Sequence, residues 1–138
     1  MRRIPSAFLA IVSMLGLGGV SLAVWPIGTS TDLTDHRGDP RRGAYLARAG
    51  GCIACHSDPA SSRPALTGGA PIKTVFGSFV PPNITPHLTA GIGTWSINDF
   101  ALAVRQGVAP DGAPYYPSFP YAFYGHLSDQ DIADLWAA

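Results

Sequence analysis

Hydrophobic and polar positions divide the chain into an apolar beginning and a mixed remainder. Arg2 and Arg3 precede residues 8–25 (Phe8 to Trp25), a run without a single charged side chain. A positive segment followed by an apolar run is typical of a secretory signal, and this run also approaches the length that crosses a bilayer as a helix. We therefore expect residues 1–27 to be a signal-anchor, or a signal peptide cleaved after Ala23. Both interpretations export the rest of the chain and leave the positive end in the cytoplasm.

The remainder predicts a linker and one domain with short helices. Residues 28–38 are polar and have no periodicity, so we interpret them as a linker to a domain over residues 39–138. The first predicted helix begins at Asp39-Pro40, an N-cap followed by proline at the first helical position, and ends at Gly50. Spacing along this helix predicts an inward face made of Tyr45, Leu46 and Ala49.

Two further helices are predicted from their capping residues. One begins at Ser96, with Asp99 placed to complete a capping box, and ends at Gly107. The other begins at Ser128 and reaches Ala138 without a C-cap, so we expect the domain to be truncated at its C-terminus. Their predicted inward faces are Phe100, Ala103 and Val104, and Ile132, Leu135 and Trp136.

Long loops separate these helices, over residues 57–94 and 109–125. The chain has 16 glycines and 13 prolines among 138 residues, which disfavours a compact helical bundle. Loops of this length are usually functional or wrapped around something. Three short helices provide little core for a domain of this size. Another component is therefore expected to occupy its centre.

Charge and cysteine content exclude several classes of protein. The formal net charge is +0, so the chain has no basic footprint for nucleic acid. Two cysteines exclude a scaffold of several disulfides. No catalytic triad, paired-carboxylate site or phosphate loop is recognisable, so we do not expect an enzyme acting alone.

The two cysteines lie in the motif Cys52-Ile53-Ala54-Cys55-His56. C-x-x-C-H is the attachment motif of c-type haem: two thiols add to the vinyl groups of one porphyrin edge, and the next histidine binds the iron. A thioredoxin-like site would need a βαβ pattern, a zinc site would need a fourth ligand such as His87 or His126, and a disulfide over so short a loop would be strained. We therefore predict one covalent haem c, bound by Cys52, Cys55 and His56, with His56 as the metal ligand.

With this motif in place, the chain resembles the class I c-type cytochrome domain. It resembles most the cytochrome c subunits of membrane-bound alcohol, aldehyde and gluconate-type dehydrogenases. The residues that carry the resemblance are Arg42-Gly43-Ala44-Tyr45-Leu46, Cys52–His56, Thr67-Gly68-Gly69, Thr74-Val75-Phe76-Gly77, Asn83-Ile84-Thr85-Pro86, Gly91-Ile92-Gly93-Thr94-Trp95-Ser96 with Asp99-Phe100, Gly107, Asp111-Gly112 and Tyr116-Pro117-Ser118-Phe119-Pro120-Tyr121.

The resemblance implies an all-α cytochrome c fold. Three to four short helices and long loops would wrap around one covalently bound haem. The first and last helices would cross at Gly43, against Leu135-Trp136, while Trp95 and Phe100 would line the haem pocket. Asn83-Ile84-Thr85-Pro86 would shape the loop around the propionates.

One position departs from the pattern of the resembling proteins. They have Y-P-x-M-P-Y, in which the methionine is the second axial ligand, whereas this chain has Phe119 there. Met1 and Met14 are its only methionines. The sixth ligand could therefore be His126, His87 or Lys73, or the iron could be five-coordinate or hold water beneath Phe119.

The leading functional hypothesis is electron transfer. The chain would be a monohaem cytochrome on the periplasmic side of the inner membrane, anchored there, or free in the periplasm if the signal is cleaved. Its expected partners are a dehydrogenase subunit and a downstream cytochrome, quinone or oxidase of a respiratory chain. The alternative is a small-ligand-binding or peroxidase-like haem protein with an open sixth coordination site.

Overall fold

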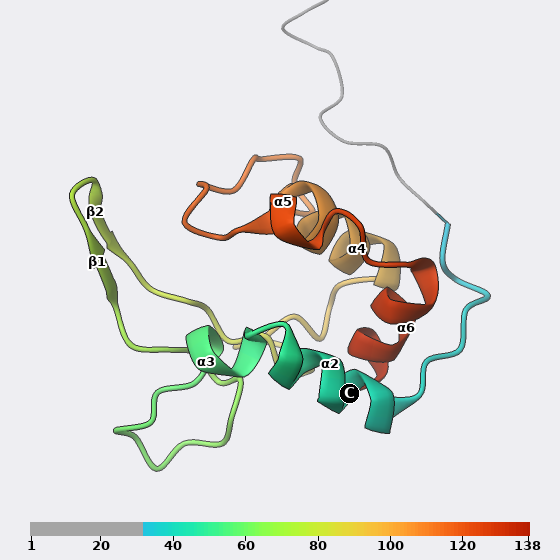
Figure 1. The fold of residues 1–138 in the computed structure, drawn as a ribbon, viewed down its shortest axis with the longest axis horizontal. Coiled ribbons are helices and arrows are strands. Elements are labelled where there is room, and N and C mark those ends of the chain that lie inside the picture. The colour runs from blue at the N-terminus through green and yellow to red at the C-terminus, as the bar shows by residue number, and fades with distance from the viewer. Residues whose placement is uncertain (1–31) are drawn as a thin grey trace, which may run out of the picture.

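The computed structural model describes residues 32–138. The predicted signal-anchor over residues 1–27 lies outside this part of the chain. The described elements are α2 (Pro40–Ala49), α3 (Cys52–His56), β1 (Ile72–Thr74), β2 (Gly77–Phe79), α4 (Ile97–Gln106), α5 (Tyr121–Tyr124) and α6 (Asp129–Ala137) (Figure 1). None of the helices within residues 32–138 has the length and apolar character needed to cross a membrane.

The predicted helix ends are confirmed by their hydrogen bonds. The Asp39 carboxylate accepts from the backbone N–H groups of Arg41 and Arg42 at the start of α2. Ser96 with Asp99, and Ser128 with Asp131, form reciprocal capping boxes at α4 and α6. Such caps satisfy N–H groups that the helix itself leaves without a partner.

The first and last long helices pack closely at a glycine. A Cβ atom on Gly43 of α2 would lie 1.8 Å from the backbone oxygen of Asp134 in α6. The predicted crossing at Gly43 is therefore confirmed, but Asp134 and Ala138 lie nearest to the glycine, and not the predicted Leu135-Trp136. The predicted inward face of α2 holds for Leu46 and Ala49, which line the central cavity, but not for Tyr45, which is 69% exposed. Gly43 and Ala47 are the buried residues of the helix, because its backbone approaches α6 at Gly43.

A small hydrophobic core lies between α4, α6 and the segment before α2. Leu33 is fully buried with Ala101 and Ile132, and its N–H donates to Asn98 Oδ1 at 2.8 Å. Residues 28–38 were interpreted as a linker because they are polar and aperiodic. Leu33 corrects this interpretation for the described part of the segment, since a single apolar side chain fixes it to the core without producing any periodicity.

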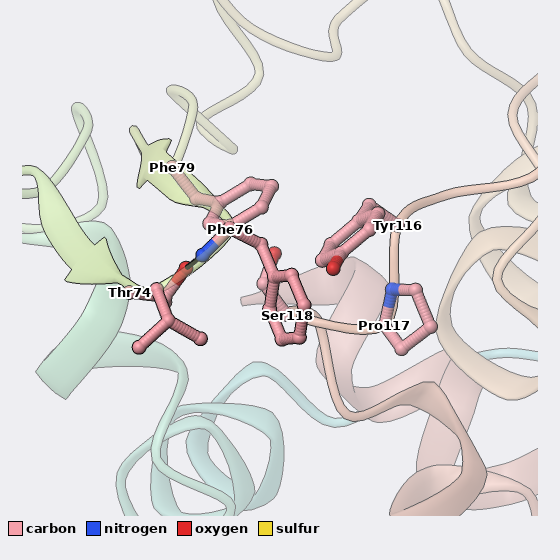
Figure 2. Close-up of a pocket in the computed structure, with 7 residues that line it drawn as sticks. Thr74, Phe76, Phe79, Tyr116, Pro117 and Ser118 are labelled. Atoms are coloured by element: carbon pink, nitrogen blue, oxygen red, sulfur yellow. Dashed lines mark hydrogen bonds between the residues drawn. The ribbon is translucent and has the colours of Figure 1, made fainter.

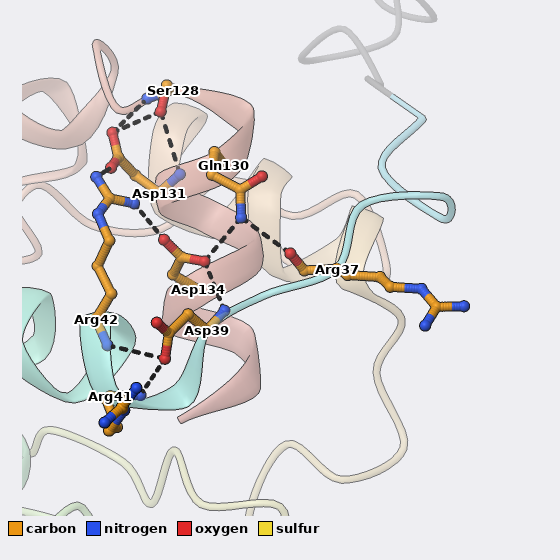
Figure 3. Close-up of polar contacts among 8 residues, drawn as sticks. All are labelled: Arg37, Asp39, Arg41, Arg42, Ser128, Gln130, Asp131 and Asp134. Atoms are coloured by element: carbon orange, nitrogen blue, oxygen red, sulfur yellow. Dashed lines mark hydrogen bonds and ion pairs between the residues drawn. The ribbon is translucent and has the colours of Figure 1, made fainter.

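A polar network reinforces the crossing of α2 and α6 (Figure 3). Asp134 is 1% exposed and accepts from Asp39 N at 2.7 Å and from Gln130 Nε2 at 2.8 Å. Arg42 forms ion pairs with both Asp134 and Asp131. The hydrogen bond from the Asp39 N–H is the main reason why the pKa of Asp134 lies below its ordinary value. Burial acts in the opposite direction, and the contacts with Gln130 and Arg42 lower the pKa further. The sole buried carboxylate of the described core is therefore kept charged and partnered.

Two short elements were absent from the sequence prediction. β1 and β2 form an antiparallel hairpin with Ile72 opposite Phe79, and Gly77 takes the positive φ of 132° that follows its two-residue tip. α5 adds a single turn after Pro120. Counting α3 and α5, residues 32–138 contain five helices, whereas three to four were expected. Strands of three residues with exposed side chains have no alternating pattern to detect.

Candidate functional site

A large cavity occupies the centre of the domain. Its volume is about 880 Å³, within the range of roughly 300–1,000 Å³ usual for ligand and cofactor sites. The wall combines α3, the loop over residues 78–84, residues of α4, and the segment before and within α5. Figure 1 shows α3 on one side and the chain leading into α5 on the other. Apart from His56, every residue lining it is uncharged.

The C-x-x-C-H motif forms one side of this cavity. Gly51 adopts a left-handed conformation, with φ of 79°, that separates α2 from α3. α3 then presents Cys52, Cys55 and His56 to the cavity. Both thiols are free; Cys55 is exposed, and Cys52 is partly buried. Burial raises the pKa of the Cys52 thiol. The predicted attachment residues thus lie together at the edge of one apolar cavity.

His56 is oriented by a backbone carbonyl. Its Nδ1 lies 2.8 Å from the oxygen of Pro82. A carbonyl oxygen only accepts hydrogen bonds, so Nδ1 carries a proton, and in the neutral ring Nε2 is the nitrogen with the lone pair. Hydrogen bonds of this kind fix the ring orientation of metal-binding histidines and raise their basicity. The sequence motif predicted His56, but it contained no signal for Pro82, which acts through its backbone.

Two glycines allow the chain to pack directly against the motif. The N–H of Gly68 donates to His56 O at 2.9 Å, and the N–H of Gly69 donates to Pro81 O at 3.0 Å. A Cβ atom on Gly69 would lie 1.7 Å from Cys55 O. The Gly68-Gly69 pair therefore connects α3 with the segment that holds His56 in orientation.

Aromatic side chains form the opposite side of the cavity. Phe119 packs against three rings, with centroid distances of 6.2 Å to Tyr115, 6.4 Å to Tyr121 and 5.8 Å to Tyr124. The Tyr124 hydroxyl donates to Gly50 O at 2.7 Å, which connects this wall with the end of α2. Phe119 is thus held in the wall, at the position where the resembling proteins have methionine.

Several of the other predicted wall residues also line the cavity. Trp95 and Phe100 do so, together with Val104 of α4 and Leu135 of α6. Phe100 also contacts Trp136, with ring centroids 5.4 Å apart. Asn83 lines the cavity and accepts from the N–H and hydroxyl of Thr85 at 2.8 and 2.7 Å, which shapes the loop over residues 83–86.

The candidate sixth ligands from the sequence are placed elsewhere. His87 and His126 are exposed, and neither they nor Lys73 line the cavity. His87 Nδ1 accepts from the N–H groups of Ala90 at 3.2 Å and Thr89 at 3.3 Å. Across residues 32–138, no three His, Cys, Asp or Glu side chains lie close enough together to hold a metal ion, so the zinc alternative has no ligand set in this part of the chain.

An apolar surface that sequence reasoning missed lies beside the cavity mouth. A pocket of about 330 Å³ separates the β1–β2 hairpin from residues 116–118 (Figure 2). Phe79 stacks on Tyr116 at a centroid distance of 4.6 Å, which connects the two segments. At the hairpin tip, Val75 is 93% exposed and Phe76 is 78% exposed. We call Val75, Phe76, Phe79 and Tyr116 the hairpin patch.

Comparison with known proteins agrees with this geometry. The chain is 43% identical to a "Diheme cytochrome c-type" protein of Cereibacter sphaeroides, over 99% of this chain and 47% of the relative. It is 47% identical to the gluconate 2-dehydrogenase cytochrome c subunit of Pantoea cypripedii, over 70% of this chain and 22% of the relative. The chain resembles the cytochrome c subunits of dehydrogenases. The resemblance inferred from its motifs is thereby confirmed.

The fructose dehydrogenase cytochrome subunit of Gluconobacter japonicus is a further relative, 37% identical over 96% of this chain and 27% of the relative. The chain thus spans less than half the length of these curated relatives. No protein-family model matches the chain. The relatives imply a c-type cytochrome fold and haem c.

The residues present fit that group. A flat apolar macrocycle requires a large uncharged cavity, two thiols at one edge and an imidazole with a free nitrogen. The cavity, Cys52 with Cys55, and His56 with its Nδ1 bonded to Pro82 meet these three requirements.

Proposed function

We propose that the chain is an electron-transfer cytochrome with one covalently bound haem c. It would be the electron-accepting subunit beside a dehydrogenase. The observation that carries the proposal is the central cavity, which is lined by Cys52, Cys55 and His56. The Nδ1 of His56 is hydrogen-bonded to the Pro82 oxygen. The names of the relatives, which include gluconate and fructose dehydrogenase cytochrome subunits, support the same role. The chain has one C-x-x-C-H motif, which supports a single haem.

The residues of the chain each have a physical role in this function. When bound, haem c supplies an iron that exchanges one electron. Cys52 and Cys55 would hold the macrocycle, and His56, whose ring orientation is fixed by the Pro82 carbonyl, would bind the metal. Phe100, Val104 and Leu135 exclude water from the cavity, which lowers the local polarity and is one of the ways a protein sets the reduction potential of such a centre.

Location and partners follow from the same proposal. Residues 1–27 would tether the domain to the periplasmic side of the inner membrane, which raises its effective concentration near a dehydrogenase in that membrane. The hairpin patch lies beside the cavity and exposes Val75, Phe76 and Tyr116, so it is the surface we assign to the partner. A downstream cytochrome, quinone or oxidase would then receive the electron.

An optical redox titration of the exported protein tests the proposed role. We expect one reversible transition with the slope of a one-electron couple, identical in the oxidative and reductive directions. The same titration on Cys52→Ala/Cys55→Ala protein should show no covalently attached chromophore. A wild-type protein that carries haem but cannot be cycled reversibly would contradict the electron-transfer role.

A further inference from the structure

The cavity wall contains few side chains able to bind iron strongly besides His56. Beyond the two cysteines, the side-chain oxygens on the wall belong to Asn83, to Ser78 and Ser118, and to the three tyrosines 115, 116 and 124. Asn83 Oδ1 already accepts two hydrogen bonds from Thr85. Serine hydroxyls are weak ligands for haem iron, whose usual protein ligands are His, Met, Cys thiolate and Tyr.

The tyrosines are poorly placed to act as ligands. Tyr124 donates its hydroxyl proton to Gly50 O, and burial raises its pKa, which disfavours the phenolate. Burial also raises the pKa of Tyr115, with the charge of Asp111 as a smaller cause. Tyr116 is 50% exposed and stacked on Phe79 at the rim of the cavity.

The segment that leads into α5 contributes Phe119 to the cavity wall, and this side chain has no lone pair. Its ring is fixed by the neighbouring tyrosines, and α3 lies on the other side of the domain from the chain that leads into α5 (Figure 1). His87 and His126 are exposed and outside the wall, and Lys73 also lies outside it. Within residues 32–138, His56 is therefore the one strong axial donor that the cavity presents.

We propose that, with haem c bound, the coordination position across from His56 accepts a small neutral molecule of the carbon monoxide class instead of a side chain. The inference rests on the proposed function, since it requires the haem. Neutrality follows from the wall: it contains no lysine or arginine, and burying an anion without a cationic partner is costly. The apolar surface of Phe119 and its neighbours suits an uncharged diatomic molecule.

Electron-paramagnetic and optical spectra of the exported full chain test this inference, with carbon monoxide as the probe. We expect a high-spin ferric signal, and a large shift of the ferrous absorption when carbon monoxide is added. A low-spin ferric signal with no response to carbon monoxide would overturn the inference, because a protein ligand would then hold the position. That ligand would be sought with His126→Ala and His87→Ala, which we expect to leave the spectra unchanged.

A gain-of-ligand variant makes the test sharper. Phe119→Met places a thioether in the wall across from His56, so it should convert the ferric signal to low-spin and abolish the carbon monoxide shift. Phe123→Met is the matched control, because Phe123 also lines the cavity but is 77% exposed. It should keep the wild-type response.

Failure of this inference is distinguishable from failure of the proposed function. Suppose that the protein contains covalent haem and can be oxidised and reduced reversibly, but its spectra do not respond to carbon monoxide. That result would refute only the open coordination position and not the electron-transfer role. Protein without covalent haem would refute both.

Discussion

His56 performs two tasks because the two nitrogens of an imidazole point in different directions. Nδ1 bonds to Pro82 O, and Nε2 is left with a lone pair. This arrangement fixes the orientation of the ring, as a metal-binding histidine requires. We expect iron ligation in this domain to depend on His56 and not on the exposed His87 and His126.

His56→Ala tests that claim. The two thioethers can still form, so covalent haem should persist, but the iron loses its protein ligand and the absorption spectrum should change. Added imidazole should restore much of the wild-type spectrum. His126→Ala is the matched control and should resemble the wild type. An unchanged spectrum in His56→Ala would show that the iron is held elsewhere.

Asp134 gives a pH-dependent prediction. Its pKa is lowered from the ordinary 3.8, first by the N–H of Asp39 and then by Gln130 and Arg42. A carboxylate with a lowered pKa contributes stability that is present above its ordinary pKa and lost as the pH falls through its folded-state value. Asp134→Asn should therefore lower Tm at about pH 7, and the difference from wild type should shrink at about pH 3.

Thermal unfolding of the two proteins across this pH range is the measurement. Asp35→Asn is the control, because Asp35 is exposed and makes none of the contacts of the Asp134 network. A difference in Tm that stays the same at both pH values would contradict the role assigned to the Asp134 charge.

At the residue scale, the sequence predicted the side chains that carry distinctive chemistry. Cys52, Cys55 and His56 were identified because their spacing is tied to one reaction. Pro82 and Gly50 act through backbone oxygens, which every residue possesses, so nothing in the sequence marks them. The burial of Leu33 was not predicted for a related reason, because a single buried side chain produces no periodic pattern in the sequence.

At the scale of elements, the crossing of α2 and α6 sets the shape of the domain. Gly43 lets the two backbones approach each other. The side chain of Asp134 also accepts a hydrogen bond from the N–H of Asp39, the N-cap residue of α2. Helix ends were predictable because caps are local in sequence. The exposure of Tyr45 was not, because the orientation of α2 depends on the approach of its backbone at Gly43 to Asp134, a residue far along the chain.

Gly43→Ala gives a prediction in which the direction of the stability change distinguishes two effects. Alanine is the better helix former by about 0.5–1 kcal/mol, so helix propensity alone predicts stabilisation. The added Cβ would lie 1.8 Å from Asp134 O, so we expect overpacking to dominate and to cost about 1–3 kcal/mol. Denaturant unfolding checks this, and a stabilised variant would refute the close crossing.

The β1–β2 hairpin gives an element-scale prediction about partners. Phe76 is exposed at its tip and does not line the main cavity. Phe76→Ser should therefore slow electron exchange with a dehydrogenase partner and leave the reduction potential nearly unchanged. Leu88→Ser is the control, since Leu88 is 68% exposed and lies outside both pockets. Stopped-flow kinetics distinguish the two, and equal rates for both variants would exclude the hairpin patch as the docking surface.

At the scale of the whole molecule, the domain has little core of its own. Among the described residues, half of the buried hydrophobic side chains are alanines; the full set is Leu33, Ala47, Ile92, Ala101, Ala103, Val108, Ile132 and Ala133. The cavity of about 880 Å³ lies at the centre, where a core would otherwise be. The sequence predicted a missing centre from its short helices and long loops, and the haem c that fills it is the central claim of this account.

The most direct test is the intact mass of the exported protein, measured after denaturation, when only covalent groups remain. The account predicts the polypeptide plus one haem for the wild type, and the polypeptide alone for Cys52→Ala/Cys55→Ala protein, which should also lose its stable fold. A wild-type mass without haem, from cells that attach haem to other c-type cytochromes, would contradict the account.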